Sequence, residues 1–170
     1  KTIQEDLGTT QSQLIWAINA YTLVFASLLF TWGVLGDRFG RKRILIIGLT
    51  LFALASALTA FASSPEQLII FRGLMGIGAA SVLPVTLSII TVIFPPQERG
   101  KAIGIWSAIA GVGIGLGPFV GGLLLEWFSW SSVFWLNVPI VAVALIGAAA
   151  LLLVPAAVQA AAKGGSVRRG

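Results

Sequence analysis

Long apolar runs separated by short polar segments dominate this sequence. Five runs are long enough to cross a membrane, at about 13–36, 44–62, 68–94, 102–125 and 133–154. About 20 helical residues span the roughly 30 Å hydrocarbon core of a bilayer. No stretch shows the period-two alternation of a membrane barrel strand. The pattern predicts an all-α membrane helix bundle of five spans over residues 1–155, followed by a flexible cytoplasmic tail or linker over 156–170.

The charged residues lie mostly in the short polar segments and predict the orientation of the spans. Lys and Arg mark the cytoplasmic side of a membrane protein. An outside N-terminus and a cytoplasmic C-terminus place nine of the eleven basic residues inside, namely Arg38, Arg41, Lys42, Arg43, Arg99, Lys101, Lys163, Arg168 and Arg169. The same orientation leaves Lys1 outside and Arg72 in the membrane. We therefore expect a multi-pass protein of the plasma (inner) membrane.

The composition excludes most soluble classes of protein. Hydrophobic residues make up 57% of the 170 residues and charged residues only 10%, whereas a soluble domain carries about 25% charged residues. The chain has no Cys and no His, so it lacks thiolate metal ligands and the commonest general base. No nucleophile–base pair or metal cluster is visible, so we expect no enzyme. Because topology accounts for the basic residues, we expect no nucleic-acid partner.

The polar segment after the first run contains a dense motif. It reads Gly33-Val34-Leu35-Gly36-Asp37-Arg38-Phe39-Gly40-Arg41-Lys42-Arg43. A tight turn on the cytoplasmic side explains the cations, but it does not explain the adjacent acid or the glycines on both sides. A carboxylate at a helix boundary pairs with Arg or caps the N-terminus of another helix. The motif is therefore either a simple turn or a contact made in one conformation and broken in another.

Arg72 is the only charged residue well inside a run. A lone charge in the membrane costs at least about 2.5–3.5 kcal/mol, and such a residue is a functional candidate by default. The alternative is that Arg72 snorkels to the outer surface, since it lies only about 9 Å along the helix from Glu66.

Alternating glycines occupy the fourth run, from Gly111 to Gly122, with Pro118 among them. A dinucleotide-binding loop would need a preceding strand and a downstream acid, which this uncharged run does not offer. Small residues four apart let helix backbones approach closely. The pattern therefore predicts close helix packing.

Taken together, these motifs resemble the major facilitator superfamily, in its fourteen-span drug:proton antiporter branch. Residues 33–45 match the loop pattern Gly-x-Leu-x-Asp-Arg-x-Gly-Arg-Lys-x-x-Leu, position for position. In that family the loop links the second and third spans and helps to latch the cytoplasmic gate. The residues that the resemblance assigns to the gate motif are Gly33, Asp37, Arg38, Gly40, Arg41 and Lys42.

Two further motifs resemble the same family. The stretch from Arg72 to Ala80 is similar to the fourth-span motif Arg-x-x-x-Gly-x-Gly-Ala-Ala, in which the arginine is associated with proton coupling. Gly76 and Gly78 are its glycines. The fifth-span motif of antiporters, which shapes the central cavity and prevents leak, is matched by Gly113, Gly117, Pro118, Gly121 and Gly122.

The resemblance implies family spans two to six, most of the N-terminal six-helix half of a multidrug efflux transporter. Phe134-x-x-Asn137-x-Pro139 resembles the start of the sixth span. The implied function is alternating-access efflux driven by a proton gradient, with no other cofactor. The implied partners are drug-like small molecules, protons, membrane lipid, the first span and the C-terminal half. The alternative is a transport-incompetent fragment or a membrane interaction module.

Overall fold

The computed structural model describes residues 3–167, and the side chains of residues 3–150. All its elements are helices: α1 (Ile3–Leu7), α2 (Gln11–Phe39), α3 (Arg41–Ala60), α4 (Pro65–Ala79), α5 (Val82–Ile93), α6 (Pro96–Trp127) and α7 (Ser132–Val167). Five helical units are long and apolar enough to cross a membrane, and α4 and α5 together form one of them. The predicted all-α membrane bundle is therefore confirmed. The predicted tail, 156–170, lies outside the residues whose side chains are described.

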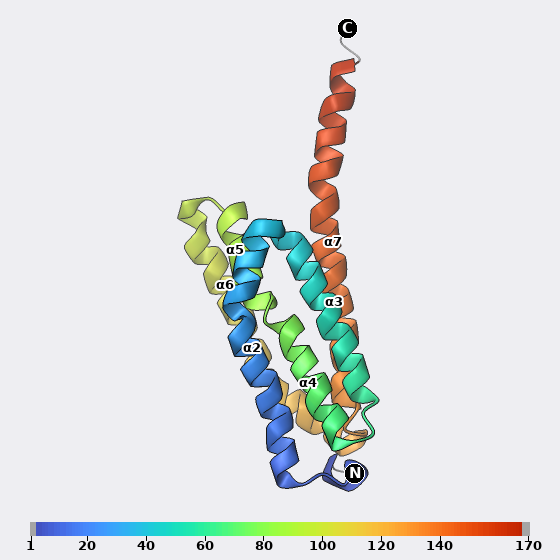
Figure 1. Cartoon of the computed structure of the whole chain (residues 1–170). Helices are drawn as coiled ribbons and strands as arrows, with labels where there is room; N and C mark the ends of the chain where they lie inside the picture. The colour runs from blue at the N-terminus through green and yellow to red at the C-terminus, as the bar shows by residue number, and fades with distance from the viewer. Residues whose placement is uncertain (1–2, 168–170) are drawn as a thin grey trace.

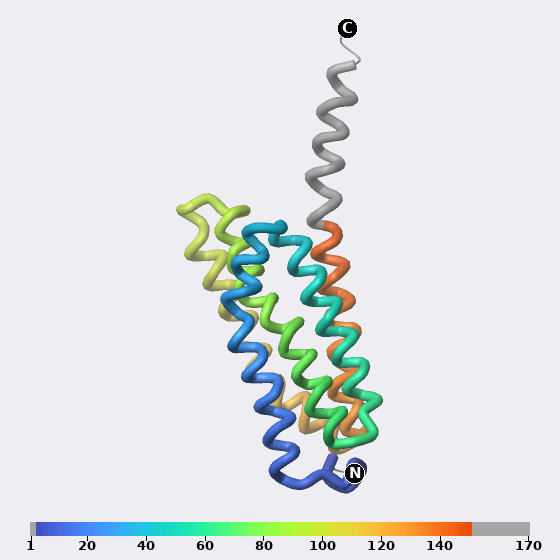
Figure 2. The backbone as a smooth tube through the Cα atoms, viewed as in Figure 1, coloured from blue at the N-terminus to red at the C-terminus, as the bar shows by residue number. Residues whose placement is uncertain are grey.

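The membrane-length helices run up and down beside one another, so their connections alternate between two ends of the bundle (Figure 1). The α2–α3 and α5–α6 connections lie at one end, and the α3–α4 and α6–α7 connections lie at the other end with α1 (Figure 2). The basic clusters at 38–43 and 99–101 therefore gather at the same end. The position of both basic clusters at one end agrees with the orientation expected from the charges. That this end faces the cytoplasm remains a prediction.

Local signals in the sequence begin two of the spans. The Thr10 side chain accepts a hydrogen bond from the Gln13 backbone N–H, and the Gln13 side chain accepts one from the Thr10 backbone N–H. This capping box satisfies two backbone donors at the start of α2. Ser64 caps α4 in a similar way, and Pro65 occupies its first turn, where a missing N–H costs nothing.

The core lies where α4 packs between α2 and α3, with α7 against the far side of α3. Glycines allow the close approach. A Cβ atom on Gly76 would lie 2.6 Å from the carbonyl oxygen of Tyr21 on α2, and one on Gly78 would lie 2.6 Å from that of Gly48 on α3. Among the described residues, α6 contributes none to the buried core, and it packs mainly against α5 and α7.

The third predicted span, 68–94, is broken rather than continuous. The Ser81 N–H donates to the carbonyl of Gly78 (3.2 Å) instead of continuing the α-helical pattern to Ile77. Pro84 has no N–H to donate to the previous turn. The released carbonyl of Ile77 accepts a hydrogen bond from the Trp32 indole at 2.8 Å. The break is therefore satisfied by a side chain from α2, as a membrane interior requires.

Candidate functional site

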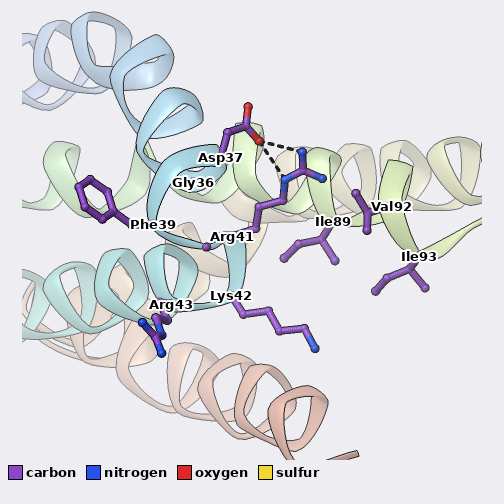
Figure 3. A pocket seen from close by; sticks show the side chains of 10 residues that line it. Gly36, Asp37, Phe39, Arg41, Lys42, Arg43, Ile89, Val92 and Ile93 are labelled. Atoms are coloured by element: carbon purple, nitrogen blue, oxygen red, sulfur yellow. Dashed lines mark hydrogen bonds and ion pairs between the residues drawn. The ribbon is translucent and has the colours of Figure 1, made fainter. Parts of the chain in front are cut away.

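The gate motif forms an ion pair at the basic end of the bundle. Asp37 on α2 accepts two hydrogen bonds at one carboxylate oxygen, from Nε (3.0 Å) and Nη2 (2.8 Å) of Arg41 on α3. The Nη1 atom of the same guanidinium donates to the backbone carbonyl of Ser88 on α5, at 2.8 Å. Arg41 therefore connects three helices through one side chain. Figure 3 shows its contact with Asp37.

The ion pair is not a large source of stability. The side chain of Arg41 is 29% exposed and that of Asp37 is 63% exposed. Exposed pairs contribute about 0–1 kcal/mol to folding. The free energy needed to separate them is therefore small enough for the contact to form and break during a functional cycle.

Glycines set the path of the chain around this pair. Gly40 lies between α2 and α3 with φ +97°, a backbone conformation that other residues rarely adopt. A Cβ atom on Gly36 would lie 3.3 Å from the Val85 side chain, and one on Gly33 would lie 3.7 Å from the Pro84 side chain. These glycines let α2 lie close to α5, which brings Ser88 within reach of Arg41.

A cavity of about 690 Å³ opens beside the ion pair (Figure 3). Its polar side comes from the α2–α3 turn, and its apolar side comes from the last turns of α5. The lining residues are Gly36, Asp37, Phe39, Gly40, Arg41, Lys42, Arg43, Ile89, Val92 and Ile93. The structure therefore brings four predicted gate residues, Asp37, Gly40, Arg41 and Lys42, to one cavity. Gly33 and Arg38 do not line it, and the Arg38 guanidinium lies 5.4 Å from the Phe39 ring centre.

Arg72 lies between two aromatic rings. Its guanidinium carbon is 4.5 Å from the ring centre of Tyr21 on α2 and 6.0 Å from that of Phe134 on α7. Among residues 3–150 the structure pairs Arg72 with no carboxylate. A desolvated cation–π contact is worth about 2 kcal/mol, against an insertion cost of about 2.5–3.5 kcal/mol. The two rings therefore offset part of the cost of this half-buried charge.

The glycines of the fourth-span motif help to create this arrangement. Gly76 follows Arg72 by one helical turn, so both residues face the same side of α4. The close contact of Gly76 with the Tyr21 backbone brings the tyrosine beside Arg72. Gly78 faces α3 instead, against Gly48 and Phe52. The predicted glycines thus have packing roles that position Arg72.

Phe134 is held by polar contacts that the sequence motifs did not reveal. Ser56 on α3 donates to the backbone carbonyl of Phe134 (2.8 Å), and the Asn137 amide donates to the Ser56 hydroxyl (3.1 Å). The Phe134 ring packs edge-on against Trp130, whose indole donates to Asp6. Ser56 is fully buried. A buried hydroxyl needs a partner, and here it fixes α7 against α3.

Sequence analysis missed Tyr21, although a signal was available. Tyr21 is the only tyrosine of the chain, and it lies within an apolar run. A phenol in such a run usually has a polar partner. Nothing in the local pattern indicated that this partner is Arg72, because the contact joins two helices.

The antiporter motif is on α6, and its predicted close packing is not found among the described residues. No atom lies within 4 Å of a Cβ built on Gly113, Gly117, Gly121 or Gly122. Pro118 lies inside the helix. The glycine face of α6 is open in this chain, and the contacts of α6 are mainly with α5 and α7.

Comparison with known proteins identifies the family. The sequence profile of the Major Facilitator Superfamily matches residues 1–168. The chain belongs to the Major Facilitator Superfamily. This membership agrees with the resemblance seen in the motifs and with the membrane-length helices of the fold.

Relatives within the Major Facilitator Superfamily have names that refer to resistance and efflux. The methyl viologen resistance protein SmvA of Salmonella typhimurium is 45% identical over 145 residues, which cover 85% of this chain and 29% of SmvA. The methylenomycin A resistance protein of Streptomyces coelicolor is 45% identical, with 85% and 30% covered. The multidrug efflux pump LfrA of Mycolicibacterium smegmatis is 47% identical, with 81% and 28% covered. The chain thus spans less than a third of the length of these relatives.

Proposed function

We propose that this chain forms part of a proton-coupled efflux transporter of the fourteen-span branch. Protons would move inward while drugs or other amphipathic small molecules move outward, by alternating access of two halves around a central site. The names of the relatives support export of toxic compounds. The observation that carries the proposal is the three-helix contact of Arg41 with Asp37 and Ser88, built from the gate motif at the basic end of the bundle.

The Arg41 contact suits a gate. It connects α2, α3 and α5 in the conformation described, and its exposed ion pair costs about 1 kcal/mol or less to break. A second conformation in which Asp37 or Arg41 has a new partner would recover this small cost. The proposal assigns the latch to Asp37 and Arg41, and it assigns the turn between the helices to Gly40.

The other two motifs have roles in coupling and in the cavity. Arg72 is the membrane charge that responds to proton binding elsewhere in the transporter. The α6 motif, with Gly113, Gly117 and Pro118, shapes the side of α6 that is open in this chain. The first span and the C-terminal half of the transporter would cover that side. The proton gradient is the energy source, and no other cofactor is proposed.

The proposed location is the plasma (inner) membrane, with the N-terminus of this chain outside and its C-terminus in the cytoplasm. The basic clusters at one end of the bundle support this orientation, because Lys and Arg are retained on the cytoplasmic side. Accessibility labelling of single cysteines introduced at Ser63 and Gly100 tests it in intact cells. Outside labelling at Ser63 with protection at Gly100 is expected, and the reverse pattern contradicts the orientation.

Transport itself is tested in inverted membrane vesicles that contain the complete transporter. The probe is ethidium, an aromatic cation, and an imposed pH gradient supplies the energy. Ethidium movement that follows the gradient and stops when a protonophore collapses it is the expected result. Ethidium movement that continues at the same rate after the protonophore is added would exclude proton coupling. Vesicles with the Asp37→Asn variant report whether the gate motif takes part.

A second candidate is a membrane interaction module that does not transport. It is favoured by α6, which has no buried residue among those described, although it is long enough to span a membrane. Such a module would insert into membranes and bind other helices through α6. Cross-linking from α6 in native membranes separates the candidates: cross-links to the remaining spans of the same transporter support the transporter, and cross-links only to other membrane proteins support the module.

A further inference from the structure

We propose that Tyr21 and Phe134 are positioning residues for Arg72, and that their rings hold its guanidinium within the membrane in place of a counter-ion. We call these two residues the ring pair. The inference rests on the proposed role of Arg72 in proton coupling. It adds two residues, Tyr21 and Phe134, to which none of the recognised motifs assigns a role in positioning Arg72.

The ring pair comes from two helices, α2, which packs against α4, and the start of α7, which packs against α3. Tyr21 is on α2 with its ring centre 4.5 Å from the guanidinium carbon, and Phe134 is on α7 at 6.0 Å. Both distances are within the range in which a cation is attracted to the negative face of an aromatic ring. Arg72 is therefore located by two neighbours, and a change in either helix position changes its environment.

The ring pair is fixed in place by contacts of its own. The close approach of Gly76 to the Tyr21 backbone sets the distance between α2 and α4. On the other side, Ser56 and Asn137 fix the backbone of Phe134, and Trp130 packs against its ring. A flexible surface aromatic has no comparable support. The extent of this support indicates that the ring positions matter.

No acid on the packed helices replaces the ring pair in the described structure. The charged and titratable residues of α2, α3, α4 and the described part of α7 are Tyr21, Asp37, Arg38, Arg41, Lys42, Arg43, Glu66 and Arg72. Asp37 and the basic cluster lie at the α2–α3 turn, and Glu66 lies in the first turn of α4. Asp6, on α1, accepts from Trp130.

Holding a cation on aromatic rings has a consequence that an ion pair would not have. The rings attract the guanidinium without neutralising its charge. The charge of Arg72 therefore stays available to the proton-coupled step, and the positions of the two rings decide where that charge lies.

The first test changes the rings and measures the initial rate of proton-driven ethidium efflux by the complete transporter. Tyr21→Phe keeps the ring and should retain the wild-type rate. Tyr21→Leu and Tyr21→Met remove the ring and should lower the rate about tenfold. Phe134→Leu should lower it less, because its ring is further from Arg72. Phe30→Leu is the matched control, since Phe30 is an exposed aromatic on the same helix.

The second measurement separates positioning from packing through the pH dependence of efflux. If the rings decide where the charge of Arg72 lies, Tyr21→Leu should shift the midpoint of the pH profile. A loss of packing alone should lower the rate equally at every pH. An unchanged midpoint with a rate reduced equally at every pH would assign Tyr21 to packing alone and overturn the proposal.

Two further comparisons keep the outcomes distinct. Size-exclusion chromatography and thermal unfolding of each purified variant show whether it is folded. If Tyr21→Leu is not folded, Tyr21→Met replaces it as the variant without a ring. Arg72→Ala with a full rate of proton-driven efflux would remove the proposed coupling role itself. If Arg72→Ala abolishes efflux while Tyr21→Leu and Tyr21→Met behave as Tyr21→Phe does, the coupling role stands and the ring pair is overturned.

Discussion

At the scale of single residues, Arg41 shows how one side chain combines charge and geometry. Its guanidinium contacts Asp37 with two nitrogens and the Ser88 carbonyl with the third. A planar group with several fixed donors can make these contacts together, whereas a lysine ammonium acts as a single point charge. A lysine at position 41 would keep the positive charge but could not make all of these contacts, so the three-helix contact requires the guanidinium group.

Arg41→Lys should lower the efflux rate of the complete transporter about tenfold while changing its stability by less than about 1 kcal/mol, because the ion pair is exposed. Efflux of ethidium and thermal unfolding measure the two effects. Arg43→Lys is the matched control, since Arg43 lines the same cavity. Equal rates for both variants and wild type would show that charge alone suffices at Arg41.

Gly40 makes a second prediction at this scale. Its φ of +97° is strained for any residue with a side chain, so Gly40→Ala should destabilise the protein by about 1–3 kcal/mol. Gly104→Ala on α6 is the control, because Gly104 is helical and has open space around it. Alanine favours a helix by about 1 kcal/mol over glycine, so the control should be neutral or stabilising. Unfolding in a denaturant series compares them.

At the scale of helices, close crossings of α4 with its neighbours organise the core. Gly78 and Gly48 bring α4 and α3 together, and Gly76 brings α4 to α2. Helix association within lipid depends on such close packing, because burial of apolar surface gives no advantage there. The crossings therefore determine stability, and through Tyr21 they also determine where Arg72 lies.

Gly78→Ala should destabilise the bundle by about 1–3 kcal/mol, since a Cβ atom there would lie 2.6 Å from a backbone oxygen of α3. The neighbour is backbone and cannot rotate away. Gly73→Ala provides the control on the same helix, because its nearest neighbour would be 4.0 Å away. Thermal unfolding of residues 1–170 in detergent measures both, and an unfolding temperature for Gly78→Ala equal to that of the control would contradict the crossing.

Much of this organisation was available in the sequence, because membrane spans are defined by length and apolarity. The five spans follow from such local patterns, and the gate motif was predicted from its resemblance to the family's loop sequence. The break at Ser81 does not, because it depends on which backbone carbonyl Ser81 bonds and on an indole from another helix. The contact of Tyr21 with Arg72 escaped for the same reason: it forms only when α2 and α4 meet.

At the scale of the whole molecule, the two faces of the chain differ in what they contact. The helices α2, α3, α4 and α7 bury residues against one another, whereas α6 buries none among those described. Large apolar side chains along α6 are exposed, including Ile109, Ile114 and Phe119. Apolar side chains can contact lipid or other helices at similar free energy, so their exposure alone does not show which of the two covers α6. The glycines favour another helix, because small residues allow a helix backbone to approach closely and lipid chains do not require this.

Substitution of those glycines therefore gives different results in the short chain and in the complete transporter. Gly113→Leu should leave the unfolding temperature of residues 1–170 unchanged or slightly higher, because no other helix lies within 4 Å of its Cβ position and leucine favours a helix over glycine. In the complete transporter the same change should lower ethidium efflux about tenfold or more, because a larger side chain would separate α6 from helices outside this chain. Leu116→Ile, a neighbouring exposed position, is the control. Full efflux by Gly113→Leu would mean that lipid covers this face, and the α6 motif would then have no part in shaping the cavity.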